Sequence, residues 1–142
     1  MLMLQSGMMG FNLDMNQLLE YSRNLAKSSD EFENFLKGFL IEMANRIIAK
    51  TKPRTPVDTG ALRSSWKLGD LISDEKSVSI EIQNPQEYAT EIEYGHRIVR
   101  NGAEVGWYEG RFMLKISIDE VKKQMPLRFA NDFTMWCEQR GL

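Results

Sequence analysis

The chain has few of the residues on which common enzymatic and cofactor sites depend. Its 142 residues include one cysteine, Cys137, and one histidine, His96. One cysteine cannot form a disulfide within the chain, and one histidine cannot supply the imidazole cluster that many zinc sites use. The usual sequence motifs for zinc, phosphate or dinucleotide binding are also missing. The sequence therefore predicts no catalytic residue, no cofactor and no metal ion.

Long apolar runs and a strong charge of one sign are missing as well. No segment has the roughly 18 consecutive apolar residues that a membrane-spanning helix needs, so we expect no membrane contact. The opening MLMLQSGMMGF is apolar but has no basic segment, and we expect no secretory signal. Eighteen basic and twenty acidic residues give a net charge of −2, which argues against a dominant nucleic-acid-binding surface.

The length fits one domain. Residues 1–13 contain four of the nine methionines and are predicted to form an N-terminal arm. Methionine adapts to irregular surfaces, so the arm either packs on a neighbouring subunit or frays in a free monomer. Residues 14–142 are predicted to form a single α+β domain.

Apolar residues three or four positions apart predict helices at both ends of this domain. A short helix is expected over residues 14–26, and a longer one over residues 31–50, ended by Pro53. A similar series from Leu114 to Trp136 predicts a long C-terminal helix. Since Pro126 falls inside that series, the helix is expected to be kinked or broken there.

The middle of the chain predicts a small antiparallel sheet of about four strands. Residues 66–72 and 77–83 are expected to form one pair, because apolar and polar residues alternate in the second segment. Residues 96–100 and 103–108 are expected to form another pair around Asn101-Gly102, a favoured hairpin turn. The helices and this sheet together define an α+β fold.

A short helix is also expected over residues 87–94, between the two pairs of strands. Its spacing places Tyr88 and Ile92 in the core, and Gly95 suits its C-terminus. Glu91 and Glu93 in this helix, with the neighbouring His96, are candidate polar groups of a subunit interface.

The segment TPVDTGALRSSW, residues 55–66, predicts a rigid elbow before the first pair of strands. Pro56 stiffens the approach to the elbow. Asp58 or Thr59 is expected to cap a short helical turn, and Gly60 permits close backbone packing.

Within this elbow, Leu62 and Trp66 are four residues apart and face the same side. We expect both side chains to anchor the turn to the core. Arg63 lies on another face, where it is predicted to pair with an acidic residue of the same or the next subunit. A role in folding alone and a role in contacts both remain open for this motif.

Aromatic and basic residues are mixed around the predicted hairpin. Such mixtures stack on single-stranded nucleic acid, but they are also typical of protein–protein interfaces. The net charge of −2 favours the second interpretation. The candidate interface residues here are Arg97, Arg100, Trp107, Tyr108 and Arg111.

Three segments in this order resemble a known family: TPVDTGALRSSW, then YATEIEYGH at residues 88–96, then GRFML at residues 110–114. They are similar to the neck and tail-completion proteins of tailed bacteriophages, the family that includes minor tail protein Z. The resemblance spans about residues 30–140. Its first segment is the most specific. The structural motif that the resemblance marks consists of Thr55, Pro56, Asp58, Thr59, Gly60, Leu62, Trp66, Tyr88 and Gly95.

The resemblance implies a non-enzymatic structural subunit that forms a ring, expected to be a hexamer, at the head-proximal end of the tail. Its implied partners are copies of itself, the tail terminator or the tail tube and sheath proteins, and the head-side connector or collar proteins. DNA would at most pass through the lumen. The protein is therefore expected in the neck of a virion or tail-like particle, and in the host cytoplasm during assembly.

Three alternatives stay open on the sequence. The first is a tail terminator or head-closure protein of the same assembly module. The second is a small hydrolase whose cleft would contain Asp58, Glu91 and His96. The third is a nucleic-acid-binding module that would use the basic and aromatic residues of the hairpin.

Overall fold

The computed structural model describes residues 2–5, 8–14, 30–74 and 77–141, and these form the predicted α+β fold. The helix expected over residues 14–26 lies almost wholly outside the described residues. The strands are β1 (Leu2–Gln5), β2 (Met8–Asp14), β3 (Lys67–Ser73), β4 (Val78–Asn84), β5 (Gly95–Arg100) and β6 (Ala103–Glu109). The helices are α2 (Asp30–Arg54), α3 (Ala61–Ser64), α4 (Ala89–Tyr94) and α5 (Met113–Gln139).

Four strands form an antiparallel sheet in the order β1-β2-β4-β3. The central strand β4 alternates as the sequence predicts, with Val78, Ile80 and Ile82 buried in the core. The turn between β3 and β4 is supported by Asp74, which accepts a hydrogen bond from the Ser77 backbone N–H at 2.8 Å.

The sequence predicts the number of strands in this sheet but not its members. Residues 2–5 and 8–14, assigned to the N-terminal arm, supply two of its strands, and β2 pairs with β4 from Met9↔Asn84 to Asp14↔Ser79. The predicted hairpin forms a separate two-stranded sheet, β5-β6. Most β5 and β6 side chains are exposed, so this sheet does not pack onto the core.

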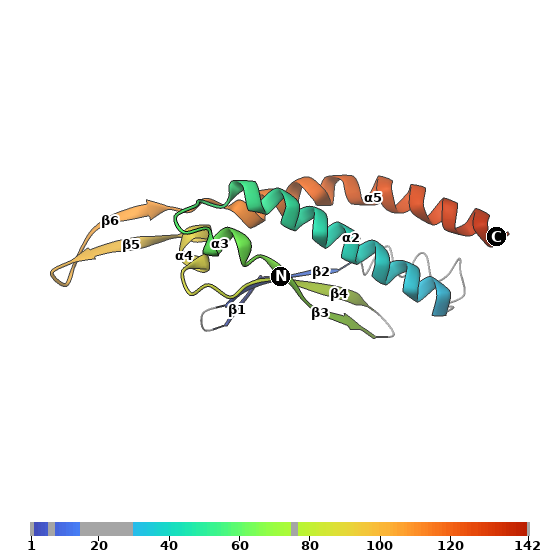
Figure 1. Cartoon of the computed structure of the whole chain (residues 1–142), viewed down its shortest axis with the longest axis horizontal. Coiled ribbons are helices and arrows are strands. Elements are labelled where there is room, and N and C mark those ends of the chain that lie inside the picture. The colour runs from blue at the N-terminus through green and yellow to red at the C-terminus, as the bar shows by residue number, and fades with distance from the viewer. Residues whose placement is uncertain (1, 6–7, 15–29, 75–76, 142) are drawn as a thin grey trace.

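Helix α2 lies between the four-stranded sheet and α5 (Figure 1). Apolar side chains on both sides of α2 are consequently buried. Aromatic rings fill its contact with α5: Phe39 meets Phe129 edge-on at 5.3 Å between centroids, and Phe32 lies 5.6 Å from Trp136. The core therefore continues through both layers, and the two long helices are fixed side by side.

Both helical prolines lie within helices rather than at breaks. Helix α2 continues through Pro53 and ends one residue later, at Arg54. Helix α5 continues through Pro126, so the predicted break is absent. Pro126 is exposed, while its neighbours Met125 and Phe129 are buried and hold the helix against the core. None of the helices in the described ranges combines the length and hydropathy needed to span a bilayer.

Candidate assembly interface

The elbow of residues 55–66 is pinned to the end of α2 by buried hydrogen bonds. The indole Nε1 of Trp66 donates to Thr55 Oγ1 at 2.9 Å, and that hydroxyl donates to the Thr51 carbonyl at 2.8 Å. Trp66 and Leu62 are both buried, as their spacing predicts. The elbow is therefore a rigid connection from α2 to β3.

The guanidinium of Arg63 forms hydrogen bonds within the elbow. Its Nε and Nη2 atoms donate to the Thr55 carbonyl at 3.3 and 2.9 Å. Arg63 has no acidic partner within the described residues, and its pairing with an acidic residue of the next subunit stays a prediction. Within the elbow, a backbone carbonyl takes the place of such a partner because the chain reverses direction beside the guanidinium.

Of the two residues predicted to cap the short helix α3, only Thr59 forms a hydrogen bond with its first turn. The residue before α3 is Gly60, with a φ of +87° and no side-chain cap. Thr59 Oγ1 accepts a hydrogen bond from the Ala61 backbone N–H at 3.3 Å. Asp58 is exposed and makes no hydrogen bond within the described residues. Pro56 is half-buried beside Thr55.

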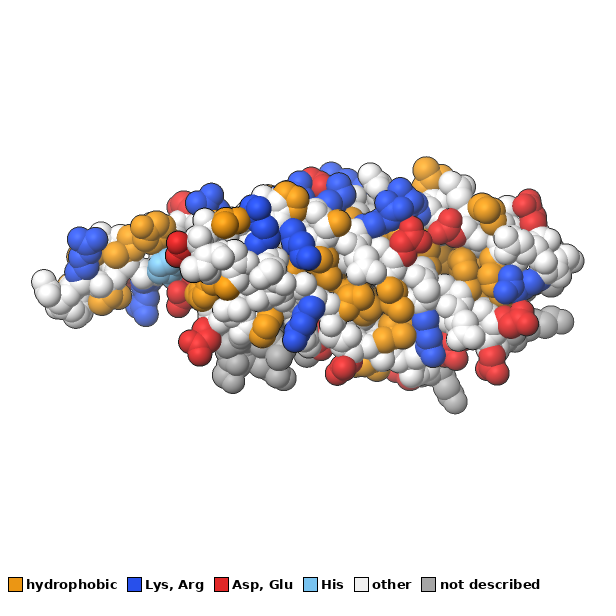
Figure 2. Space-filling view, viewed as in Figure 1, with side chains coloured by type: hydrophobic (Ala, Val, Ile, Leu, Met, Phe, Trp, Pro, Cys, Tyr) orange, Lys and Arg blue, Asp and Glu red, His pale blue; other side chains and the backbone are white. Residues whose placement is uncertain are grey.

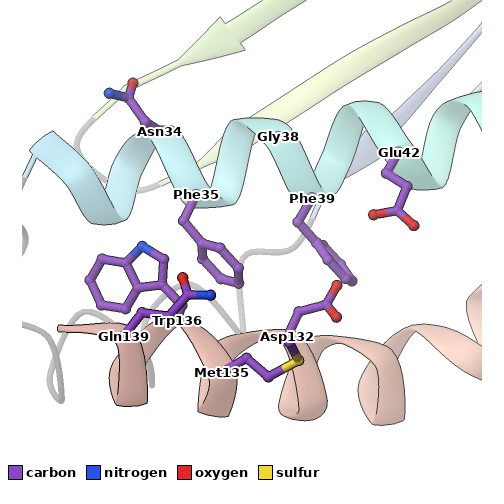
Figure 3. Close-up of a pocket in the computed structure, with 9 residues that line it drawn as sticks. All are labelled: Asn34, Phe35, Gly38, Phe39, Glu42, Asp132, Met135, Trp136 and Gln139. Carbon is purple, nitrogen blue, oxygen red and sulfur yellow. The ribbon is translucent and has the colours of Figure 1, made fainter. Parts of the chain in front are cut away.

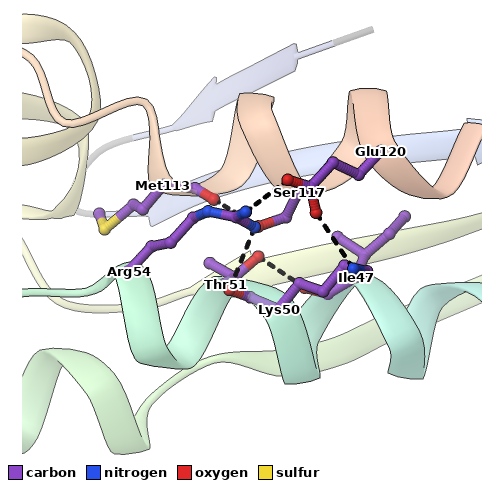
Figure 4. Close-up of polar contacts among 7 residues, drawn as sticks. All are labelled: Ile47, Lys50, Thr51, Arg54, Met113, Ser117 and Glu120. Atoms are coloured by element: carbon purple, nitrogen blue, oxygen red, sulfur yellow. Dashed lines mark hydrogen bonds and ion pairs between the residues drawn. The ribbon is translucent and has the colours of Figure 1, made fainter.

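A polar network joins α2 to α5 (Figure 4). Glu120 accepts hydrogen bonds from Lys50 at 3.1 Å and from Arg54 at 2.5 Å, and Arg54 also donates to Ser117 at 2.9 Å. The sequence alone did not predict this network. The two basic residues four apart on α2 are its only signal, and their partner lies some 70 residues away in sequence.

The Glu120→Gln variant is expected to change how stability depends on pH. The hydrogen bond from Lys50, and then that from Arg54, lower the pKa of Glu120 from its ordinary value of 4.5. A lowered folded-state pKa stabilises the fold above pH 4.5, and this contribution is lost as the pH falls through the folded-state value. Urea unfolding from pH 3 to 7 should therefore show a stability difference between wild type and variant that shrinks in acid. A difference independent of pH would contradict the prediction.

Glu93 belongs to α4 but caps α5. Its side chain is fully buried, and its carboxylate oxygens accept hydrogen bonds from the backbone N–H groups of Leu114 and Lys115, both at 3.0 Å. These N–H groups have no partner inside the helix, and a carboxylate suits the positive end of the helix dipole. Burial raises the pKa of Glu93, while the backbone hydrogen bonds oppose that rise. Glu93 is thus turned inward, and its predicted exposure at an interface is wrong.

Residues 92–95 and 110–115 form the hairpin root, where the β5-β6 hairpin leaves the body. The Arg111 and Phe112 backbone N–H groups donate to the Ile92 and Glu93 carbonyls at 2.8 and 3.1 Å. Gly95, with a φ of +87°, lies against this crossing: a Cβ there would stand 2.3 Å from the Tyr108 carbonyl oxygen. The hairpin is therefore fixed to the end of α4 and the start of α5.

The Glu93→Gln variant is expected to lose about 2 kcal/mol of the free energy of unfolding. The glutamine amide has only one acceptor oxygen, and its other end is an NH₂ donor. One of the two backbone N–H groups at the start of α5 therefore faces a donor and loses its hydrogen bond. Glu91→Gln is the matched control, because Glu91 is exposed on the same helix, and we expect a change within about 0.5 kcal/mol. Equal losses in urea unfolding would show that Glu93 is no cap.

Tyr88 is also placed differently from the prediction. It is 41% exposed, and the buried position at this end of α4 is taken by Ala89. Tyr88 precedes the helix, where its carbonyl accepts a hydrogen bond from the Ile92 N–H at 3.1 Å. Ile92 packs against the core from a half-buried position, as predicted.

The predicted hairpin residues gather on one projecting element (Figure 1). Arg97 and Trp107 are direct cross-strand partners, and the His96 ring stacks on its partner Tyr108 at 5.1 Å. Arg100 is exposed near the tip, and Arg111 is exposed at the root. Figure 2 shows hydrophobic and basic side chains together on this element. Four large apolar side chains of the hairpin are more than half exposed: Val99, Val105, Trp107 and Tyr108.

A groove opens between α2 and α5 near the opposite end of the molecule (Figure 3). It encloses about 360 Å³. The rings of Phe35 and Phe39 point from α2 toward α5 and form its floor with Trp136. Glu42 and Asp132 add carboxylates to its lining. The sequence alone did not predict this groove, because its aromatic residues follow the ordinary apolar spacing of packed helices.

The residues proposed for a hydrolytic cleft do not form one shared cluster of contacts. No hydrogen bond or ion pair joins Asp58, Glu91 and His96 in the part of the chain that the structure describes. Asp58 and Glu91 are exposed, and His96 is engaged by the stack on Tyr108. Among the same described residues, no group of three or more acidic, histidine or cysteine side chains is arranged to hold a metal ion.

A protein-family model matches slightly more than half of the chain. The family model described as "Bacteriophage HK97-gp10, putative tail-component" matches residues 20–95. The matched range includes α2, the elbow and α4, while most of the hairpin and all of α5 follow it. No curated protein and no solved structure matches the chain. The chain therefore belongs to the HK97 gp10-like family of phage tail components, and it is a structural, virion-associated protein.

Proposed function

We propose that this protein is a non-catalytic subunit of a ring at the head-proximal end of the tail. Copies of the chain would form the ring, expected to be a hexamer. It would join the tail terminator or the tail tube and sheath to the head-side connector or collar. DNA would pass through the lumen without tight binding.

The observation that carries this proposal is the presence of two different candidate contact surfaces near opposite ends of the long axis, where Figure 1 places the β5-β6 hairpin and the start of α2 with the end of α5. One is the β5-β6 hairpin and the other is the α2–α5 groove. A ring requires heterologous contacts, in which one surface of a subunit meets a different surface of the next. The pinned elbow and the capped start of α5 hold the two surfaces in a fixed relation.

The test of this function is assembly of the particle with and without the protein. Particles made without it are expected to have incomplete necks and tails that do not join heads, and supply of the wild-type chain in trans should restore them. Electron microscopy of negatively stained lysates would measure both. Normal joining of heads to tails without the protein would contradict the role.

Two other outcomes would redirect the assignment. Turnover of a substrate that is lost in Asp58→Ala, Glu91→Ala or His96→Ala, with assembly unchanged, would favour a hydrolase. Binding to single-stranded DNA that weakens steeply with salt would favour a nucleic-acid-binding module.

A further inference from the structure

We propose that the β5-β6 hairpin of one copy docks in the α2–α5 groove of the next copy. This inference rests on the proposed self-assembly and goes beyond it by naming the two surfaces that meet. The partner on each surface is a second copy of this chain. Each copy would donate one hairpin and accept one.

The hairpin has the chemistry of an inserted element. A two-stranded ribbon is marginally stable in water without something to cover it. Arg97 and Trp107 are directly opposite one another, so they share one face of the ribbon. Val99 lies two residues along β5 from Arg97, and it is 57% exposed. This face therefore presents an aromatic ring, an aliphatic side chain and a cation to the outside.

The groove has the complementary chemistry. Its floor is aromatic and is lined by Phe35, Phe39 and Trp136; Phe35 is half-buried, while Phe39 and Trp136 are buried. Its wall includes Met135, an adaptable side chain that is 57% exposed. A large apolar side chain from outside the chain would bury this surface.

The charges of the groove and the hairpin are complementary. Asp132 lines the groove and makes no ion pair within the described residues. Glu42 lines it too and is bound to Arg46 at 3.0 Å on the same helix. Arg97 and Arg100 on the hairpin have no ion-pair partner in the described part of the chain. Docking would place a cation from the hairpin beside a carboxylate that the chain itself leaves unpaired.

Gly38 leaves room for a partner beside this groove. It lies in the interior of α2, where glycine costs about 1 kcal/mol relative to alanine. A Cβ at Gly38 would meet no other atom within 4 Å, so packing within the chain does not require glycine. A residue without a side chain in a groove lining permits close approach of another backbone.

The placement of the two surfaces gives head-to-tail association. The hairpin projects from one end of the long axis, and the α2 start and α5 end lie at the other (Figure 1). Contacts between two different surfaces of identical chains generate a ring when the rotation closes. Docking of this kind is compatible with a ring, whereas two copies that exchange hairpins reciprocally would form a closed two-fold dimer.

Cysteine cross-linking tests which surfaces meet. Two full-length variants are prepared without the native thiol, Val99→Cys/Cys137→Ala and Met135→Cys/Cys137→Ala. Mild oxidation of the mixture is expected to give a covalent dimer on a non-reducing gel, while either variant alone gives little or none. A chain with both substitutions should give a ladder of linked oligomers. No dimer in the mixture, or dimers only within one variant, would overturn the proposal.

Gly38→Gln separates docking from folding. Glutamine is a good helix former with open space here, so the melting temperature is expected to rise by about 2–6 °C. Association measured by native mass spectrometry should weaken at least tenfold, because the new side chain enters the groove. Ala49→Gln, on an exposed part of α2 outside the groove, is the matched control and should leave association unchanged.

The outcomes distinguish this proposal from the proposed function. Trp107→Ser is a second variant, which removes the aromatic ring from the docking face of the hairpin. Rings that persist unchanged in Gly38→Gln and in Trp107→Ser would overturn hairpin docking, but they would not contradict the proposed ring. Loss of association in both variants, with wild-type association in Ala49→Gln, would support docking. The role in joining heads to tails is tested separately by the assembly of particles.

Discussion

Replacing Gly95 by alanine is expected to lower the free energy of unfolding by about 3 kcal/mol or more. The left-handed φ of +87° is one source of this loss. The larger source is the position of the new Cβ, which would stand 2.3 Å from the Tyr108 carbonyl oxygen and 2.9 Å from the Gly110 nitrogen. Both are backbone atoms, so the strands of the hairpin root must separate. Urea unfolding followed by circular dichroism measures the loss.

Gly60→Ala is the matched control for this prediction. Gly60 has the same φ of +87°, but a Cβ there would meet no atom within 4 Å. It therefore reports the cost of the left-handed conformation alone, about 1–2 kcal/mol. Equal losses in the two variants would show that close packing at the hairpin root adds nothing.

The Trp66→Ala variant is expected to lose about 3–5 kcal/mol, the range for a large aromatic residue removed from a core. Trp66 is 3% exposed, and its indole N–H donates to the Thr55 hydroxyl. The substitution leaves a cavity beneath the elbow and removes that hydrogen bond. Calorimetric or chemical unfolding should show a greatly reduced stability.

Trp107→Ala is the control for Trp66, since it is the same substitution at a residue that is 52% exposed on the hairpin. We expect a change in monomer stability within about 0.5 kcal/mol. Trp66→Phe keeps most of the core volume but cannot donate to Thr55, and should lose about 1–2 kcal/mol. A Trp66→Ala protein as stable as Trp107→Ala would refute the elbow as a structural anchor.

Local patterns of the sequence predict much of this fold. The alternation at Val78, Ile80 and Ile82 marks a strand with one buried face, and the structure confirms it. Asn101-Gly102 forms the hairpin turn, with positive φ values of 53° and 77°. Each of these features depends on residues close in sequence, so one sequence is enough to identify it.

Features that depend on distant residues could not be predicted. The pairing of β2 with β4 joins segments some 70 residues apart, and the apolar opening residues gave no indication of that partner. Glu93 looks like an exposed helix carboxylate, but its burial depends on where α5 begins. Helical spacing placed Tyr88 in the core, while the later start of α4 leaves it outside.

The central claim is that the chain works by contact with copies of itself in a ring at the head-proximal end of the tail. Electron cryomicroscopy of the assembled particle tests it most directly. The expected result is a closed ring of this protein between the head-side connector and the tail, in which each copy contacts its two neighbours through different surfaces. A reconstruction with isolated copies, or with this chain elsewhere in the particle, would contradict it.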